Sequence, residues 1–112
     1  MANFYKNALY APTTTNTVTV YSCPSNSRAI IQNIQLTNES GSKNVKVLVT
    51  DYSTSTNVQI AYAAVSGPTI CNLAKGPIIL EESDILSMQT SNVSTVTAIV
   101  SILEINRTDE NG

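Results

Sequence analysis

The chain has 112 residues, of which 42% are hydrophobic and only 12% are charged, as in one globular domain with a mostly uncharged polar surface. Histidine is absent, which excludes a Ser-His-Asp triad and histidine ligation of zinc. Six Lys and Arg against eight Asp and Glu give a net charge of −2, and the basic residues are scattered, which argues against a nucleic-acid groove.

The apolar residues are largely β-branched and alternate with polar ones, a pattern that predicts an all-β fold. No apolar run approaches the roughly 20 residues of a transmembrane helix. The first residues also lack the basic start and long apolar core of a signal peptide. We therefore expect no membrane segment and no secretory leader.

The N-terminal segment carries three of the six aromatic residues and lies outside the clear strands. Its candidate contact residues are Phe4, Tyr5, Leu9 and Tyr10. Because aromatic side chains are strong interface anchors, they predict an extended arm that docks on a neighbouring subunit. The alternative is an edge strand of the same domain, and both stay open.

The first predicted strand is TVTVY at residues 17–21, and the second is RAIIQNIQLTN at residues 28–38. In the second strand Ile30, Ile34 and Leu36 share a face, which a glutamine interrupts. A short turn around a glycine leads to the third strand. We expect the second and third strands to form a β-hairpin.

The third strand is NVKVLVTD at residues 44–51, with its valines facing inward. The fourth is NVQIAYAA at residues 57–64, in which alternation places Val58, Ile60 and Tyr62 on one face. Later short strands are predicted at residues 69–74, 78–80 and 86–88.

The last strand, residues 96–105, shows the clearest alternation, with Val96, Ala98, Val100 and Ile102 on one side. The pattern as a whole gives about eight short antiparallel strands with turn signals roughly every ten residues, typical of a single-domain β-sandwich. Jelly-roll and immunoglobulin-like strand orders both stay open. We divide the chain into an N-terminal arm at residues 1–16, a sandwich domain at residues 17–105 and a polar tail at residues 106–112.

The acidic corner of Glu81, Glu82 and Asp84 lacks the ligand spacing of a calcium loop, so we predict a solvated turn without metal. The two cysteines, Cys23 and Cys71, are expected to be buried or half-buried thiols, although a disulfide is left open. Neither has a neighbouring basic cluster that would activate it as a nucleophile.

Several segments, taken in order, resemble small virion structural proteins of tailed bacteriophages, most closely those of marine cyanophages. The shared features are YKN at residues 5–7, TTTN at 13–16, VYSCPS at 20–25, AII at 29–31, PIILEESDIL at 77–86 and SILEI at 101–105. The resemblance covers about residues 4–105. It implies a β-sandwich on the phage particle and transfers no catalytic residue.

These observations favour a non-enzymatic capsid decoration (cement) protein that binds the outer surface of the major capsid protein lattice, as a homo-oligomer and most simply a trimer. Such a protein is made in the host bacterial cytoplasm and needs no cofactor, nucleic acid or membrane. The candidate partner-binding residues are Phe4, Tyr5, Leu9, Tyr10 and Arg28.

Two alternatives stay open. One is an accessory structural protein of the neck, tail or fibre. The other is a host-surface glycan-binding module, for which the sequence outside the N-terminal segment offers only Tyr21, Tyr52 and Tyr62 as aromatic contacts.

Overall fold

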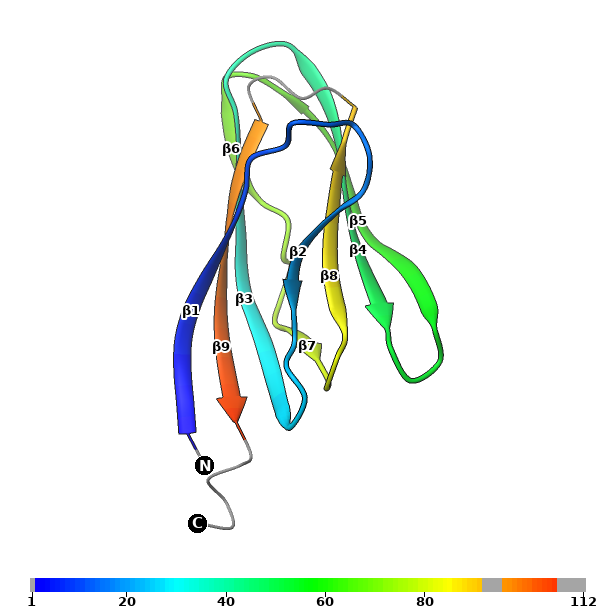
Figure 1. Cartoon of the computed structure of the whole chain (residues 1–112). Coiled ribbons are helices and arrows are strands. Elements are labelled where there is room, and N and C mark those ends of the chain that lie inside the picture. The colour runs from blue at the N-terminus through cyan, green and yellow to red at the C-terminus, as the bar shows by residue number, and fades with distance from the viewer. Residues whose placement is uncertain (1, 92–95, 107–112) are drawn as a thin grey trace.

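The computed structural model describes residues 2–91 and 96–106, which form nine strands in two antiparallel sheets (Figure 1). Sheet A contains β1 (Ala2–Tyr10), β9 (Val96–Asn106), β3 (Ser27–Asn38), β6 (Thr69–Asn72) and β7 (Ile78–Leu80). Sheet B contains β2 (Val18–Ser22), β8 (Ile85–Thr90), β4 (Ser42–Asp51) and β5 (Thr56–Ser66). The predicted all-β sandwich is therefore confirmed.

The strand order identifies a jelly roll. Strand β1 pairs with β9, β2 with β8, β3 with both β6 and β7, and β4 with β5, so the chain forms one long antiparallel ribbon. The ribbon is wound so that β9 also pairs with β3, and β8 with β4. The resulting orders, β1-β9-β3-β6 and β2-β8-β4-β5, differ from those of an immunoglobulin sandwich.

The N-terminal segment is an edge strand rather than an arm. All nine residues of β1 pair with β9, from Ala2 opposite Asn106 to Tyr10 opposite Ala98. This placement is the alternative that the sequence left open, and it moves the start of the sandwich from residue 17 to the beginning of β1. Of the predicted polar tail, residues 107–112 lie outside the described residues.

The predicted hairpin between the second and third strands is wrong. Strand β3 lies in sheet A and β4 in sheet B, so the connection between them crosses the sandwich. A second crossing, from β5 to β6, packs against it: the Gly67 N–H donates to the Gly41 carbonyl over 2.9 Å. The buried Asn38 amide also donates to the carbonyls of Gly41 and Val65, over 2.9 and 3.1 Å.

Gly67 is required at this junction by the space around it. A β-carbon there would lie 2.8 Å from the Asn38 carbonyl oxygen and 2.7 Å from the Glu39 carbonyl carbon. Both atoms belong to the backbone and cannot rotate away. No local sequence pattern reveals this close approach of the two crossing connections.

β-Bulges change which residues face the core. In β3 a bulge between Ile31 and Asn33 leaves Gln32 without a partner, so Ile31 before it and Ile34 after it are both buried. The prediction that Ile30 shares a face with Ile34 is therefore wrong, because Ile30 points outward. The glutamine that interrupts the apolar row marks the bulge itself.

A second bulge, in β5, skips Ile60. Val58 then lies opposite Val49, on the inner side, whereas Tyr62 lies opposite Lys46, on the outer side. The prediction that these three β5 residues share a face is wrong for the same reason as in β3.

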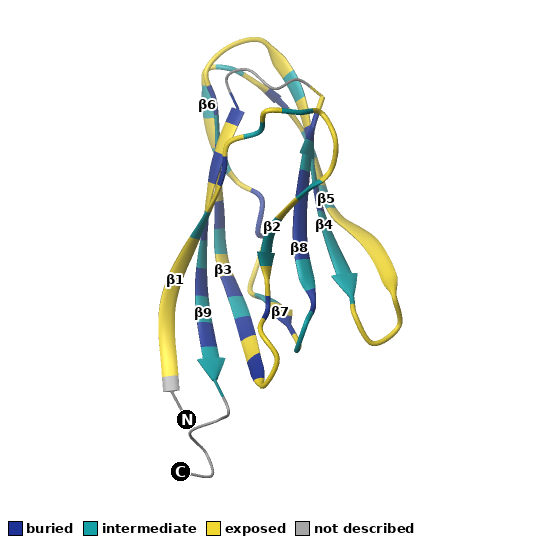
Figure 2. Ribbon diagram, in the orientation of Figure 1, coloured by how far each residue is buried: buried dark blue, intermediate teal, exposed yellow. Residues whose placement is uncertain are grey.

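The core lies between the sheets, and Figure 2 shows its buried residues along β9, β3 and β8, while β1 and the end of the β4–β5 hairpin are exposed. In β9 the predicted inward face of Val96, Ala98, Val100 and Ile102 is confirmed, since all four are buried. No helix among the described residues has the length and apolar character to cross a membrane.

The acidic corner is partly buried, which corrects the prediction of a solvated turn. The Asp84 carboxylate is buried and accepts hydrogen bonds from the backbone N–H groups of Tyr52 and Glu81, over 3.0 and 2.9 Å. It thereby holds the β4–β5 loop against the corner between β7 and β8.

Both cysteines are free, as predicted, with Cys23 buried and Cys71 half-buried. Burial, helped by the nearby carboxylates of Glu104 and Asp84, raises the pKa of the Cys23 thiol to about 11.

Candidate functional site

The outer face of sheet A carries a row of apolar side chains that the register aligns across four strands. Tyr5 in β1 lies opposite Leu103 in β9, which lies opposite Ile30 in β3, which lies opposite Ile79 in β7. Directly paired residues point to the same side of a sheet, so these four side chains form one strip, here called the outer apolar row. Tyr5 is 80% exposed and Ile79 is 63% exposed.

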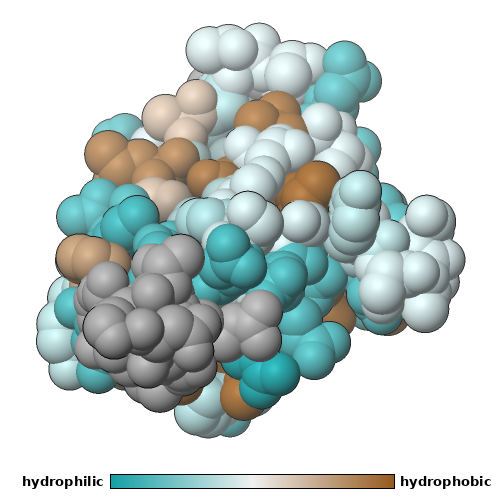
Figure 3. Space-filling model, turned by 60° about the horizontal axis from the view of Figure 1, so that its bottom comes forward, coloured by the Kyte–Doolittle hydropathy of each residue, from teal (hydrophilic) through white to brown (hydrophobic). Residues whose placement is uncertain are grey.

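Further residues extend this face on both sides of the row. Arg28 is exposed and lies opposite Ile105, one outward-facing pair nearer the chain termini. Leu9 lies opposite Ile99, and both side chains are exposed. In the space-filling view, hydrophobic patches reach the surface among polar ones (Figure 3).

The five predicted contact residues divide between two faces. Tyr5, Leu9 and Arg28 share the outer face of sheet A with the outer apolar row. Phe4 lies on the inner side, opposite Glu104, and remains exposed near the end of the sandwich. Tyr10 is only 2% exposed within the chain's own core, so its assignment as a partner contact is wrong.

Three members of the row, Ile30, Ile79 and Leu103, are not among the contact residues predicted from the sequence. One feature of the sequence could have indicated them. Each is an apolar residue whose neighbours along the strand point into the core, so that the strand is apolar on both faces. Only the pairing register, however, shows that the three belong together.

A buried charged contact fixes β1 and links the two sheets. The Tyr21 hydroxyl in β2 donates to Glu104 Oε2 over 2.6 Å, and Lys6 Nζ in β1 lies 3.0 Å from Glu104 Oε1. Glu104 is only 3% exposed, and burial alone would raise its pKa. The Tyr21 hydrogen bond and the Lys6 ammonium outweigh burial and hold the pKa of the Glu104 carboxyl below its usual value.

The Tyr21 ring is therefore not an outward contact. Its side chain is half-buried, and burial together with Glu104 strongly raises the pKa of its hydroxyl. Among the three tyrosines considered for glycan contact, Tyr52 and Tyr62 are exposed.

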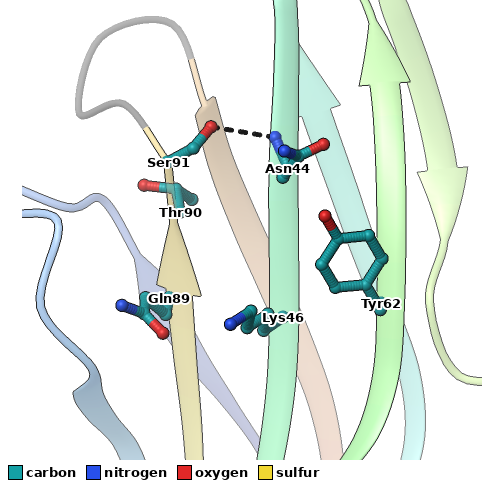
Figure 4. A pocket seen from close by; sticks show the side chains of 6 residues that line it. All are labelled: Asn44, Lys46, Tyr62, Gln89, Thr90 and Ser91. Atoms are coloured by element: carbon teal, nitrogen blue, oxygen red, sulfur yellow. Dashed lines mark hydrogen bonds between the residues drawn. The ribbon is translucent and has the colours of Figure 1, made fainter.

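The outer face of sheet B holds a shallow pocket of about 270 Å³. Its centre is a row across three strands, in which Lys46 of β4 lies between Gln89 of β8 and Tyr62 of β5. We call it the Tyr62 pocket; its lining residues are Asn44, Lys46, Tyr62, Gln89, Thr90 and Ser91 (Figure 4).

Two features of the Tyr62 pocket are fixed by the fold. The Gln89 amide donates to the Thr15 carbonyl over 2.9 Å and accepts from the Thr17 hydroxyl over 3.4 Å, so the β1–β2 connection holds it in place. The Ser91 hydroxyl accepts from the Asn44 backbone N–H over 3.0 Å. In Figure 4 the Tyr62 ring is seen nearly face-on, in front of the sheet, with its hydroxyl pointing toward Asn44.

Two of the other cavities involve residues discussed above. One, of about 340 Å³, lies where Arg28 meets the acidic corner and the β4–β5 loop. The other, of about 670 Å³, lies between β5 and the segment from Cys71 to Ile78. Among the residues that the structure describes, no group of three or more Cys, Asp and Glu is placed to hold a metal ion.

No protein-family model and no curated protein sequence matches the chain. Among solved structures, the chain is similar to one chain of the "Structure of infectious bursal disease virus Gt strain", with 12% sequence identity and a TM-score of 0.35. The match covers 95% of this chain and 31% of that one, so the present chain spans about a third of its length. A likeness at this level carries no information on function.

Proposed function

We propose that the protein is a non-enzymatic structural protein of a tailed-phage virion, and specifically a capsid decoration protein on the major capsid protein lattice. The observation that carries this proposal is the outer apolar row on sheet A. The choice of a phage particle rests on the sequence segments that resemble, in the same order along the chain, those of cyanophage virion proteins.

The outer apolar row supports a protein partner because it is preformed and its two end residues, Tyr5 and Ile79, are exposed. Contiguous apolar surface on a folded subunit marks an interaction site, and tyrosine is enriched among residues that dominate binding energy. The row lies on paired strands, so little ordering entropy is lost when a partner covers it.

The surroundings of the row suit a lattice contact. Between the row and Leu9 lie Asn7 and Ser101, which face each other in register, with Asn33 beyond them. Amide and hydroxyl groups can form hydrogen bonds across an interface without the desolvation cost of buried charges. A protein that binds the assembled shell more tightly than dissociated subunits stabilises that shell by mass action.

A protein of the neck, tail or fibre would use the same kind of surface. The number of copies per particle distinguishes that location from the capsid surface. The experiment is electron microscopy of intact particles of the phage that encodes the chain, with quantification of the protein per particle. Hundreds of copies on the head surface, contacting the capsid lattice through sheet A, are expected. A few copies at the neck or tail would contradict decoration, and absence from the particle would contradict the virion role.

Point substitutions test the contact better than truncation. Removing β1 would uncover Glu104 and leave the paired edge of β9 open, so a loss of binding after truncation could reflect unfolding. The exposed side chain of Tyr5 can be changed without touching either feature.

A further inference from the structure

We propose that the Tyr62 pocket binds one sugar ring of a saccharide that carries an acidic substituent. The pocket lies on the outer face of sheet B, on the opposite side of the sandwich from the outer apolar row. The inference goes beyond the proposed virion role and does not depend on it.

The Tyr62 ring supplies the platform for a sugar. It is 54% exposed, and its flat face is open to the viewer in Figure 4. One side of a pyranose ring presents C–H groups, which pack against an aromatic face, while its hydroxyl groups point to the rim. An aromatic surface with a few placed polar groups is the usual composition of such a site.

Amide and hydroxyl groups lie near this ring on the neighbouring strands. Asn44 and Gln89 lie on β4 and β8, and the loop residues Thr15 and Thr17 hold Gln89 in position. A primary amide has two N–H donors and an oxygen with two lone pairs, so Gln89 keeps hydrogen-bonding capacity for a ligand. Because Gln89 is positioned before binding, less entropy is lost when the ligand arrives.

Charge selects the acidic substituent. None of the six lining residues is acidic, and Lys46 supplies a positive charge between Tyr62 and Gln89. Within the described part of the chain Lys46 makes no ion pair, whereas Lys6 is neutralised by Glu104. A carboxylate on the sugar, as in a uronic acid, would complete the pairing at Lys46.

The test is binding of the purified full chain to an array of neutral and uronic-acid-containing oligosaccharides, followed by calorimetry with the best acidic one. Tyr62→Ala should lower affinity roughly tenfold or more, the loss expected when a stacking ring is removed. Lys46→Gln should abolish the preference for acidic over neutral saccharides. Tyr52→Ala removes another exposed tyrosine, which lies outside the pocket, and should leave binding unchanged.

Thermal unfolding of each variant checks that the fold is retained. The proposal is overturned if the wild-type chain binds no saccharide, binds only neutral ones, or binds equally well after Tyr62→Ala in a folded variant. Equal losses in the Tyr52 and Tyr62 variants would also overturn it, since binding would then not be located in the pocket.

Discussion

The outer faces of the two sheets differ, although both cover the same core. On sheet A the outward positions of three adjacent strands hold Leu103, Ile30 and Ile79, and Tyr5 completes the row on β1. On sheet B the corresponding central row is Gln89, Lys46 and Tyr62. An antiparallel sheet usually has one apolar and one solvated face, so sheet B follows the rule and sheet A departs from it. The departure is the reason why we propose sheet A as the side for a protein partner.

The largest effect is expected from removing the ends of the outer apolar row. The double substitution Tyr5→Ser and Ile79→Ser should weaken binding to phage particles that lack this protein by about 100-fold or more, because two anchors of the proposed interface are lost. Sedimentation of bound protein measures this. Both side chains are exposed, so thermal stability should change little.

The control for this experiment is Tyr62→Ser on sheet B, which makes the same Tyr-to-Ser change at another exposed position. It should leave particle binding intact. If it weakens binding as much as the double substitution, the two faces do not differ in the way that their composition indicates.

The next effect concerns the anchor beneath the row. Glu104→Gln removes the charge that Lys6 and Tyr21 share, and unfolding free energy in urea should fall by about 1–3 kcal/mol. Because Lys6 lies next to Tyr5 in β1, particle binding should weaken as well, while the Tyr62 pocket stays intact. Glu81→Gln, at an exposed carboxylate, is the control and should change stability far less.

The same carboxylate predicts a pH dependence. The pKa of the Glu104 carboxyl is lower in the folded chain than in the unfolded chain, so the unfolded chain takes up the proton first as the pH falls. The contribution of Glu104 is complete above the unfolded pKa and is lost as the pH falls through the folded pKa. The stability difference between wild type and Glu104→Gln should therefore be smaller at about pH 3 than at about pH 7. A difference that stays constant would show that the carboxylate does not stabilise β1 in this way.

The smallest expected effect is on the rate at which the buried thiol of Cys23 is alkylated. With its pKa raised to about 11, Cys23 should react with iodoacetamide at about pH 8 much more slowly than an unfolded thiol, because little thiolate is present. Mass spectrometry of the modified chain locates the label, and urea-unfolded protein gives the reference rate. Equal rates in folded and unfolded protein would mean that the end of the sandwich near β2 and β7 is open.

Periodicity in the sequence was sufficient to predict most strands and the all-β class. It succeeded fully in β9, where Val96 to Ile102 alternate without interruption. It failed where a bulge changes the parity, as at Gln32 and Ile60, because one extra residue reverses every later side chain. The crossing at Gly67 was missed because it depends on packing between distant connections.

The candidate sites were less accessible to sequence reasoning than the fold. Tyr5 and Leu9 were predicted as contacts from the N-terminal segment and Arg28 from its place near a turn, and all three lie on the outer face of sheet A. Tyr10 was misassigned, since an aromatic anchor and a core residue look alike without a register. The outer apolar row and the Tyr62 pocket each draw residues from three or four strands. Such groupings exist only once the strands are paired.

The ribbon winding has a consequence for biosynthesis. Among the nine described strands, β1 leaves the ribosome before the others, yet its pairing partner β9 is made after them. Contacts between such distant segments are slow to form, because a long loop must close before they are gained. During translation the strand that carries Tyr5 and Leu9 therefore stays unpaired until β9 emerges, and over that interval its open edge exposes the nascent chain to aggregation.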